Sequence, residues 1–328
     1  MTQPGRLNIA GRFPDREQRC GRPAVSAAWR IAASLLRRRC RALSVPVVEI
    51  GEARVRADLR TPLGLGLYRY GFCSAEAKLL PKLLRPGDVF VDGGANIGLF
   101  SLIGAVAVGT TGRVLACEPG PETMALLKAN AGENRFDILE LHQVALSDRL
   151  GNARFTVFEA GSGLASFAPQ STQGRQIDVV VTTLDALTED LDGRVALVKL
   201  DIEGAEAKAL RGAGGLIARD APLFLIELEP EHLARQGSSI ADVRDALEPH
   251  GYEAYAITPT AGIARLTADW QPADARAPNV VLVPPSGSAR LAGATEPPAT
   301  SHSRIRRVVS RVDPCSSKPS GTSRSGPE

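Results

Sequence analysis

The chain has 328 residues, of which 44% are hydrophobic, 23% charged and 5% aromatic, a composition typical of a globular α/β protein. The formal net charge of +3 is unevenly distributed: residues 1–60 carry about +8 and residues 284–328 about +4, whereas residues 61–283 carry about −9. An acidic middle disfavours a nucleic-acid partner, because phosphate backbones bind basic surfaces.

Cysteine usage and hydropathy favour a protein that stays in the cytoplasm. The five cysteines are odd in number and form no C-x-x-C pair, so neither a disulfide framework nor a zinc site is indicated. No apolar run reaches the roughly 20 residues that a membrane-spanning helix needs. The opening MTQPGRLNIAGRFPDREQRC also lacks the apolar core of a secretory signal. We therefore expect reduced thiols and a cytoplasmic location.

Composition divides the chain into three regions. Residues 1–44 are basic and we expect a flexible extension, with an amphipathic helix on an anionic membrane surface or a partner as the alternative. Residues 45–284 form the predicted domain. Residues 285–328 are rich in Ser, Pro, Gly and Arg and bury too little to offset chain entropy, so a disordered tail is expected.

Strand and helix patterns alternate along the domain. The expected order is strands 47–59 and 63–71, helix 74–84 with Pro81 kinking or ending it, strand 88–92, helix 97–107, strand 113–119, helix 121–131 and strand 138–146. Two shorter strands, 153–158 and 177–183, precede strand 196–202, helix 205–215, strand 222–229, helix 239–251 and strands 252–257 and 279–284. This alternation predicts a mostly parallel sheet with helices on both faces, whose sites lie at the carboxyl ends of the strands.

The first such strand end reads DVFVDGGANIG, residues 88–98. The glycines at 93, 94 and 98 do not give the G-x-G-x-x-G spacing of a dinucleotide loop. A cofactor without phosphate needs no anion site and tolerates a carboxylate. S-adenosylmethionine fits better, because Asp92 can lie near its cationic amino group, while Gly94 and Gly98 allow close approach of the backbone. A strand-to-helix turn without a ligand is the structural alternative.

Two later strand ends extend this cofactor hypothesis. Glu118 lies about 20 residues after Gly98, where an acid accepts hydrogen bonds from ribose hydroxyls in both NAD and S-adenosylmethionine proteins. An exposed acid at a strand end is the alternative for it. In VALSD, Ala145 and Leu146 are candidates for lining the adenine, with Ser147 or Asp148 near its amino group. A simple turn also explains this segment.

Taken together, the motifs DVFVDGGANIG, CEPGPETMALLKAN, VALSDRLGNARF, VTTLDAL, VKLDIEGAEAKALRGA and LIELEPEH resemble the FkbM family of S-adenosylmethionine-dependent methyltransferases over about residues 68–284. The resemblance implies a Rossmann-like class I methyltransferase with a seven-stranded sheet and one antiparallel strand. It also implies O-methylation in natural-product or surface-glycan assembly. It places the cofactor on Asp92, Gly94, Ala95, Asn96, Gly98, Glu118, Pro119, Ala145 and Leu146. Gly93 departs from the family, which usually has an apolar residue there.

The segment VKLDIEGAE places Asp201, Glu203 and Glu206 at the next strand end. Methyl transfer from a sulfonium requires alignment of the acceptor and removal of its proton. Crowded carboxylates raise one another's pKa, so Asp201 or Glu203 is predicted to act as the base or to orient the acceptor. A Lys199–Asp201 ion pair and a helix-dipole role for Glu206 are the structural alternatives.

Other readings of this edge remain open. Asp201, Glu203 and Glu227 together offer oxygens to a magnesium ion, although we predict no metal. His232 follows strand 222–229 and faces either the acceptor or solvent. Functional alternatives are an N- or carboxyl-methyltransferase, an NAD-linked oxidoreductase and a non-catalytic binding protein. The acceptor, a small molecule or a glycan, and the oligomeric state are not readable from the sequence.

Overall fold

The computed structural model describes residues 46–58, 63–64, 66–67, 74–157, 175–258, 260–266, 279–294 and 307–308. The predicted N-terminal extension and the membrane contact proposed for it lie outside these residues, as do residues 295–306 and 309–328 of the predicted C-terminal tail. Residues 285–294, which were expected to be disordered, instead form a 3-10 segment and the turn after it. Of the predicted strand 63–71, the four described residues are helical. Within the described ranges, no helix has both the length and the apolar character needed to cross a bilayer.

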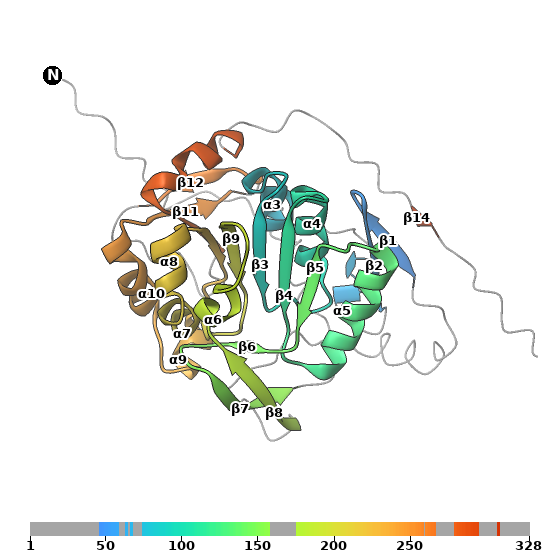
Figure 1. Cartoon of the computed structure of the whole chain (residues 1–328), viewed down its shortest axis with the longest axis horizontal. Coiled ribbons are helices and arrows are strands. Elements are labelled where there is room, and N and C mark those ends of the chain that lie inside the picture. Colours follow the sequence, from blue (N-terminus) through green and yellow to red (C-terminus); the bar gives the residue numbers. More distant parts are fainter. Residues whose placement is uncertain are drawn as a thin grey trace, which may run out of the picture.

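An eight-stranded sheet forms the centre of the domain, in the order β12-β11-β13-β10-β9-β3-β4-β5 (Figure 1). The bounds are β3 Val89–Gly93, β4 Arg113–Cys117, β5 Leu139–His142, β9 Val195–Leu200, β10 Leu223–Ile226, β11 Glu253–Ile257, β12 Ile263–Arg265 and β13 Val280–Val283. The strands from β10 to β5 are mutually parallel, and β13 runs antiparallel to both of its neighbours. The predicted mostly parallel, Rossmann-like sheet is confirmed. It has eight strands where seven were predicted, because the unpredicted edge strand β12 is a second antiparallel strand in addition to β13.

The strands of this sheet are buried on both faces, which explains their continuous apolar runs. The helices are α3 Ala75–Leu83, α4 Leu99–Val108, α5 Pro121–Asn134, α6 Leu184–Thr188, α7 Glu206–Arg211, α8 Gly214–Asp220, α9 Pro230–Arg235 and α10 Ile240–Leu247. Successive residues of β3 alternate between two cores: Val89 and Val91 pack with helices α7, α8 and α10, whereas Phe90 packs with α3 and α4. The sheet is therefore held rigidly between two helical layers.

One helix prediction becomes narrower and another is wrong. Pro81 lies inside α3, which continues to Leu83, so of the two alternatives, a kink or an end at the proline, the end is excluded. The predicted helix 205–215 is instead two helices, α7 and α8, which meet at Gly212 and Ala213. A Cβ at Gly212 would lie 2.3 Å from the backbone oxygen of Ser147, so the chain turns here where it touches another segment. Local helix propensity did not reveal this tertiary contact.

A small three-stranded sheet, in the order β6-β8-β7, lies below the main sheet in the view of Figure 1. It consists of β6 Ala145–Leu146, β7 Gly151–Val157 and β8 Arg175–Thr182, which confirms the two predicted strands that interrupt the alternation. The predicted strand 138–146 is wrong in one respect. It ends at His142 as β5, and Ala145 and Leu146 leave the main sheet to pair with β8.

The flanks of the domain also carry regular structure. The predicted strand 47–59 is a hairpin of β1 Val47–Ile50 and β2 Ala53–Arg56, and β14 Arg307–Val308 pairs with β1. After β13, the 3-10 segment η3 Pro285–Gly293 holds Arg290, whose Nη2 donates to Asp88 Oδ1 over 3.0 Å. A second 3-10 segment, η2 Glu248–His250, follows α10. The domain boundaries themselves stay predictions.

Candidate functional site

Four parallel strands end at the same edge of the sheet. Gly93 of β3 pairs in register with Cys117 of β4 and Leu200 of β9, and Leu200 pairs with Ile226 of β10. Asp92 is the penultimate residue of β3, and the segments after the other three strands carry Glu118, Asp201, Glu203, Glu206 and Glu227. We call the ends of β3 and β4 the first half of the edge, and the ends of β9 and β10 the second half.

The glycine loop after β3 is fixed by close backbone contacts. Gly94 has a φ of 76°, and a Cβ there would lie 1.9 Å from the backbone oxygen of Asp201. Gly98 has a φ of 90° and begins α4, where a Cβ would lie 2.4 Å from Leu127 Cδ1. The amides of Gly94 and Ala95 both donate to the oxygen of Cys117, over 3.0 and 2.9 Å. The loop therefore follows one path between β4 and β9.

Gly93, which departs from the family resemblance, has a packing reason. A Cβ at this position would lie 2.8 Å from Leu146 Cδ1, 3.0 Å from Leu200 Cδ2 and 3.1 Å from the oxygen of Lys199. Leu146 belongs to β6 and occupies the volume that a larger residue at 93 would need. The glycine thus lets β6 lie directly beside the end of β3.

Asp92 lies inside the protein and not at its surface. Its side chain is fully buried, and Oδ2 accepts a hydrogen bond of 2.6 Å from Ser101 Oγ. Oδ1 has no hydrogen bond and lies 3.9 Å from Lys199 Nζ. Burial raises the pKa of Asp92, and Lys199 opposes that shift. One oxygen of this carboxylate is thus still available to a cationic or hydrogen-bonding partner.

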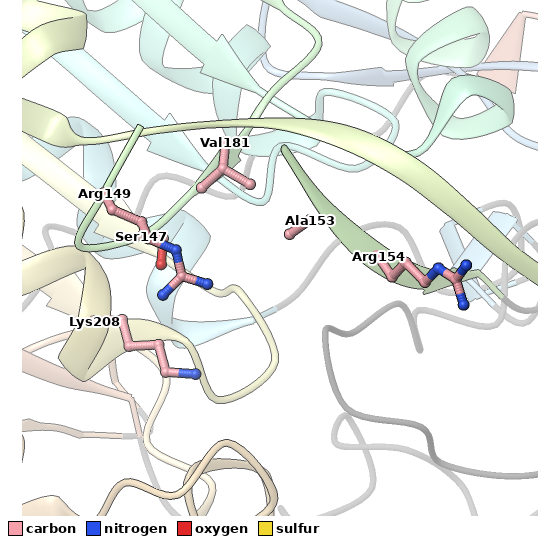
Figure 2. A pocket seen from close by; sticks show the side chains of 6 residues that line it. All are labelled: Ser147, Arg149, Ala153, Arg154, Val181 and Lys208. Carbon is pink, nitrogen blue, oxygen red and sulfur yellow. The ribbon is translucent and has the colours of Figure 1, made fainter. Parts of the chain in front are cut away.

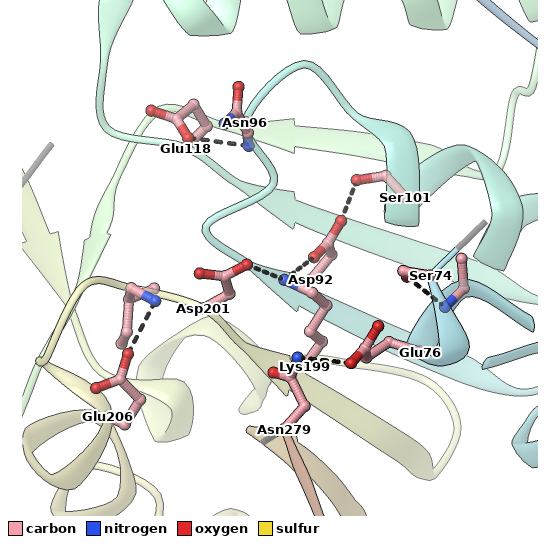
Figure 3. A network of polar contacts seen from close by, with 12 residues as sticks. Ser74, Glu76, Asp92, Asn96, Ser101, Glu118, Lys199, Asp201, Glu206 and Asn279 are labelled. Atoms are coloured by element: carbon pink, nitrogen blue, oxygen red, sulfur yellow. Dashed lines mark hydrogen bonds and ion pairs between the residues drawn. The ribbon is translucent and has the colours of Figure 1, made fainter. Parts of the chain in front are cut away.

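Lys199 joins the two halves of the edge (Figure 3). Its Nζ lies 3.2 Å from Asp201 Oδ2 and 4.6 Å from the centre of the Phe100 ring, and its side chain is buried. Burial lowers the pKa of Lys199, but the carboxylates of Asp201 and Asp92 outweigh it and the net shift is upward. The Lys199–Asp201 pair considered from the sequence is therefore present.

Glu118 is held by two loops at once. Oε2 accepts from the amide of Asn96 over 3.0 Å, and Oε1 accepts from the amide of Gly120 over 2.8 Å. Asn96 itself has a left-handed φ of 52°. Glu118 is 7% exposed, and burial raises its pKa to about 7 although both amides lower it. Its neighbour Pro119 is buried. The two amide bonds leave lone pairs on the carboxylate for further donors.

Asp201 and Glu227 form a carboxyl pair across β9 and β10. The charge of Asp201, followed by burial, raises the pKa of Glu227 far above its usual range, and a hydrogen bond joins the two side chains. Two carboxyl groups in such contact share a proton, so at neutral pH the pair carries about one negative charge. Lys199 faces that charge from the same strand as Asp201.

Glu203 pairs with His232, a contact that joins distant segments of the sequence. Glu203 Oε2 and His232 Nδ1 are 2.8 Å apart, within ion-pair distance although their angle falls short of a hydrogen bond. Their side chains are 11% and 9% exposed, and Glu203 has a strained φ of 54°. A Cβ at Gly204 would lie 2.1 Å from the oxygen of His232, so only glycine allows α9 to approach this closely.

Glu206 has a different environment from the other acids. It is 2% exposed, and its Oε1 accepts from the amides of Ile202 and Gly204 over 3.0 and 3.2 Å. Burial raises the pKa of Glu206 to about 7 against the influence of these amides. The side chain therefore closes the turn that presents Glu203, and the geometry favours a supporting role over contact with an acceptor.

Ala145 and Leu146 are buried side chains of β6. Leu146 packs in the core beside Gly93, while Ala145 packs with Phe155, Val179 and Val181 of the small sheet. Leu146 therefore lies beside the first half of the edge, whereas Ala145 belongs to the core of the small sheet. Among the residues that the structure describes, there is no group of three or more His, Cys, Asp and Glu side chains placed to hold a metal ion.

Comparison with known families agrees with this arrangement. Residues 92–254 match the methyltransferase FkbM domain. This chain carries a methyltransferase domain of the FkbM family. The match begins at Asp92 and includes both halves of the edge, so the carboxylates described above belong to the family domain.

Two curated relatives and one solved structure are similar to parts of this chain. The 31-O-demethyl-FK506 methyltransferase FkbM of Streptomyces tacrolimicus is 31% identical over 39% of this chain and 60% of its own length. The AMB antimetabolite synthetase AmbE of Pseudomonas aeruginosa is 26% identical over 52% of this chain but only 10% of its own length. The crystal structure of methyltransferase FkbM from Methylobacillus flagellatus KT shares 20% identity, 67% of this chain and 53% of that chain, with a TM-score of 0.38. This chain thus spans less than two thirds of the curated relatives that it matches.

Proposed function

We propose that the FkbM domain transfers a methyl group from S-adenosylmethionine to a hydroxyl of a small-molecule acceptor. The observation that carries the proposal is that the two halves of the sheet edge differ in their chemical groups. The first half has glycine backbone and two acids suited to a cofactor, and the second half has a Glu203–His232 pair suited to proton removal. Lys199 connects the halves.

The first half fits S-adenosylmethionine in its donors and acceptors. Asp92 Oδ1 is a buried oxygen without a hydrogen bond, complementary to an ammonium group once the loop admits one. Glu118 keeps lone pairs for the ribose hydroxyls. The residues proposed to hold the cofactor are Asp92, Gly94, Ala95, Asn96, Gly98, Glu118, Pro119, Ala145 and Leu146.

In the second half, His232 is proposed to take the proton of the acceptor hydroxyl. Nδ1 faces Glu203, which leaves Nε2 as the proton-accepting nitrogen. Glu203 orients the ring and stabilises the imidazolium that forms, while Glu206 holds the turn. Asp201 orients the acceptor, since Lys199 and Glu227 hold it at the edge. When bound, S-adenosylmethionine supplies a methyl group on a sulfonium, already a good leaving group.

The acceptor class follows from one relative and one chemical argument. The name of the Streptomyces tacrolimicus protein specifies methylation of an oxygen on a natural product. A histidine base is suited to a hydroxyl, whose proton must leave during transfer, and a carboxylate acceptor needs no base at neutral pH. As the group that is methylated, we therefore propose a hydroxyl in preference to an amine or a carboxylate. As the acceptor molecule, we propose a small natural product or a sugar in preference to a macromolecule.

A labelling experiment tests the proposal. The full chain is incubated with methyl-labelled S-adenosylmethionine and small-molecule and lipid extracts of its host. The labelled product is then treated with mild base. A base-stable ether formed by the wild type, and lost with His232→Gln, is the expected result. A base-labile methyl ester would make the protein a carboxyl methyltransferase, and a methylated amine would contradict the hydroxyl assignment.

A further inference from the structure

A cavity of about 200 Å³ lies between the small sheet and α7. It is lined by Ser147, Arg149, Ala153, Arg154, Val181 and Lys208. Figure 2 shows Arg149 and Lys208 on one side of the opening and Arg154, from β7, on the other. The wall thus combines three cationic side chains with the apolar Ala153 and Val181.

The charge of this cavity is opposite to that of the surrounding region. Among the residues that the structure describes, no acidic side chain lines it, although residues 61–283 carry about −9 overall. Asp148 lies 3.8 Å from Arg149 and 3.8 Å from Arg211, so one negative charge is shared between two arginines. Asp178 lies opposite Arg154 in the strand register, but no ion pair joins them. A net positive field therefore remains at the opening.

One cavity residue, Lys208, is linked by a hydrogen bond to the helix that follows the second half of the edge. Lys208 lies two residues after Glu206, about half a turn further along α7, and its Nζ donates to Gln236 Oε1 over 3.3 Å. Gln236 caps α9, the helix that carries His232. An ammonium group has three donors, so Lys208 can hold α9 and still bind a further acceptor of hydrogen bonds.

We propose that this cavity binds an anionic group of the methyl acceptor, a phosphate or a carboxylate. The proposal rests on the proposed function and adds a substrate class to it: an acceptor with a hydroxyl near His232 and a negative charge beside Lys208 and Arg149. The anion replaces mutual repulsion among cations with charge-assisted hydrogen bonds. Ala153 and Val181 provide an apolar surface for the carbon skeleton that carries the group.

Calorimetric titration of the full chain with inorganic phosphate, at constant ionic strength, tests the cavity directly. The double variant Arg149→Ala/Lys208→Ala removes two of its cations. Lys128→Ala on α5 is the matched control, because that lysine is exposed and distant from the cavity in sequence. We expect phosphate to bind the double variant about tenfold more weakly than the wild type, and Lys128→Ala to bind like the wild type. Equal affinity in all three proteins, or no binding to any, would overturn the proposal.

Two further titrations separate the possible sources of the anion. Phosphate must still bind when S-adenosylmethionine saturates the protein; loss of binding would mean that the cavity holds part of the cofactor. Glucose 1-phosphate must bind at least as tightly as inorganic phosphate, since exclusion of the ester would mean that only a free ion fits. Failure of S-adenosylmethionine to bind the wild type would instead refute the proposed function and leave the phosphate comparison interpretable.

Discussion

The two halves of the sheet edge are built in different ways. The first half is made by backbone: Gly94, Gly98 and Asn96 adopt left-handed conformations, and Glu118 is held by main-chain amides. The second half is made by side-chain pairs, Glu203 with His232 and Asp201 with Glu227, between segments that are distant in sequence. A backbone-built region fixes the shape of a ligand site, whereas a region of paired acids and bases is suited to moving a proton.

The largest effect is expected from Gly94→Ala. The new Cβ would lie 1.9 Å from a backbone oxygen at a φ of 76°, and neither strand can retreat within the sheet. We expect a loss of roughly 3–5 kcal/mol in the free energy of unfolding, measured by urea denaturation. Gly132→Ala is the control: it lies on an exposed turn of α5 with open space around its Cβ, and should stabilise by about 0.5–1 kcal/mol. Similar values for the two variants would show that the loop is not fixed by its backbone.

Substitutions in the second half of the edge should lower the rate of methyl transfer and leave the fold unchanged. His232→Gln removes the proposed base, so we expect methyl transfer to fall about 100-fold while binding of S-adenosylmethionine is retained. His250→Gln, an exposed histidine in η2, is the matched control and should keep full turnover. Glu203→Gln should lower turnover by a smaller factor, since the imidazole itself is still present. Full turnover by His232→Gln would remove this residue from the mechanism.

Both halves contribute to the pH dependence of stability. The pKa of Glu118 and that of Glu206 are each raised by burial from 4.5 to about 7. The folded state therefore holds protons that the unfolded state releases, so these groups stabilise the protein below pH 4.5 and this contribution is lost as the pH rises to about 7. We expect each group to lower the free energy of unfolding by up to about 3 kcal/mol across this window. Glu118→Gln and Glu206→Gln should each flatten the curve. An unchanged curve in one variant would exclude that residue as the source.

Gly93→Ala should have the smallest effect. Its Cβ would meet the flexible side chains of Leu146 and Leu200, which can shift, and the backbone oxygen of Lys199 at 3.1 Å. We expect a destabilisation of about 1 kcal/mol, well below that of Gly94→Ala, by the same urea measurement. A cost equal to that of Gly94→Ala would mean that β6 cannot move away from β3.

The same contrast separates what the sequence could predict from what it could not. The alternation of strands and helices, the glycine loop and the acids at 92, 118, 201 and 203 followed from local patterns, because buried parallel strands bring their carboxyl ends together. The Glu203–His232 pair was not predicted, since it depends on how closely α9 approaches Gly204. Full burial of Asp92 was likewise unforeseen, because Ser101 and Lys199 come from two other elements.

The cavity shows a further limit of prediction from sequence. No sequence motif distinguishes Arg149, Arg154 and Lys208. The packing of the small sheet against α7 brings these three residues together. The split of helix 205–215 has the same origin, since it depends on contact between Gly212 and Ser147. Tertiary contacts of this kind leave no periodic signal in the chain.

Titration calorimetry with S-adenosylmethionine tests the division of the edge most directly. The wild type should bind S-adenosylmethionine and not NAD, Glu118→Gln should bind at least about tenfold more weakly, and Glu203→Gln should bind like the wild type. Absence of binding by the wild type, or equal weakening by Glu118→Gln and Glu203→Gln, would contradict the assignment of the cofactor to the first half and of proton removal to the second.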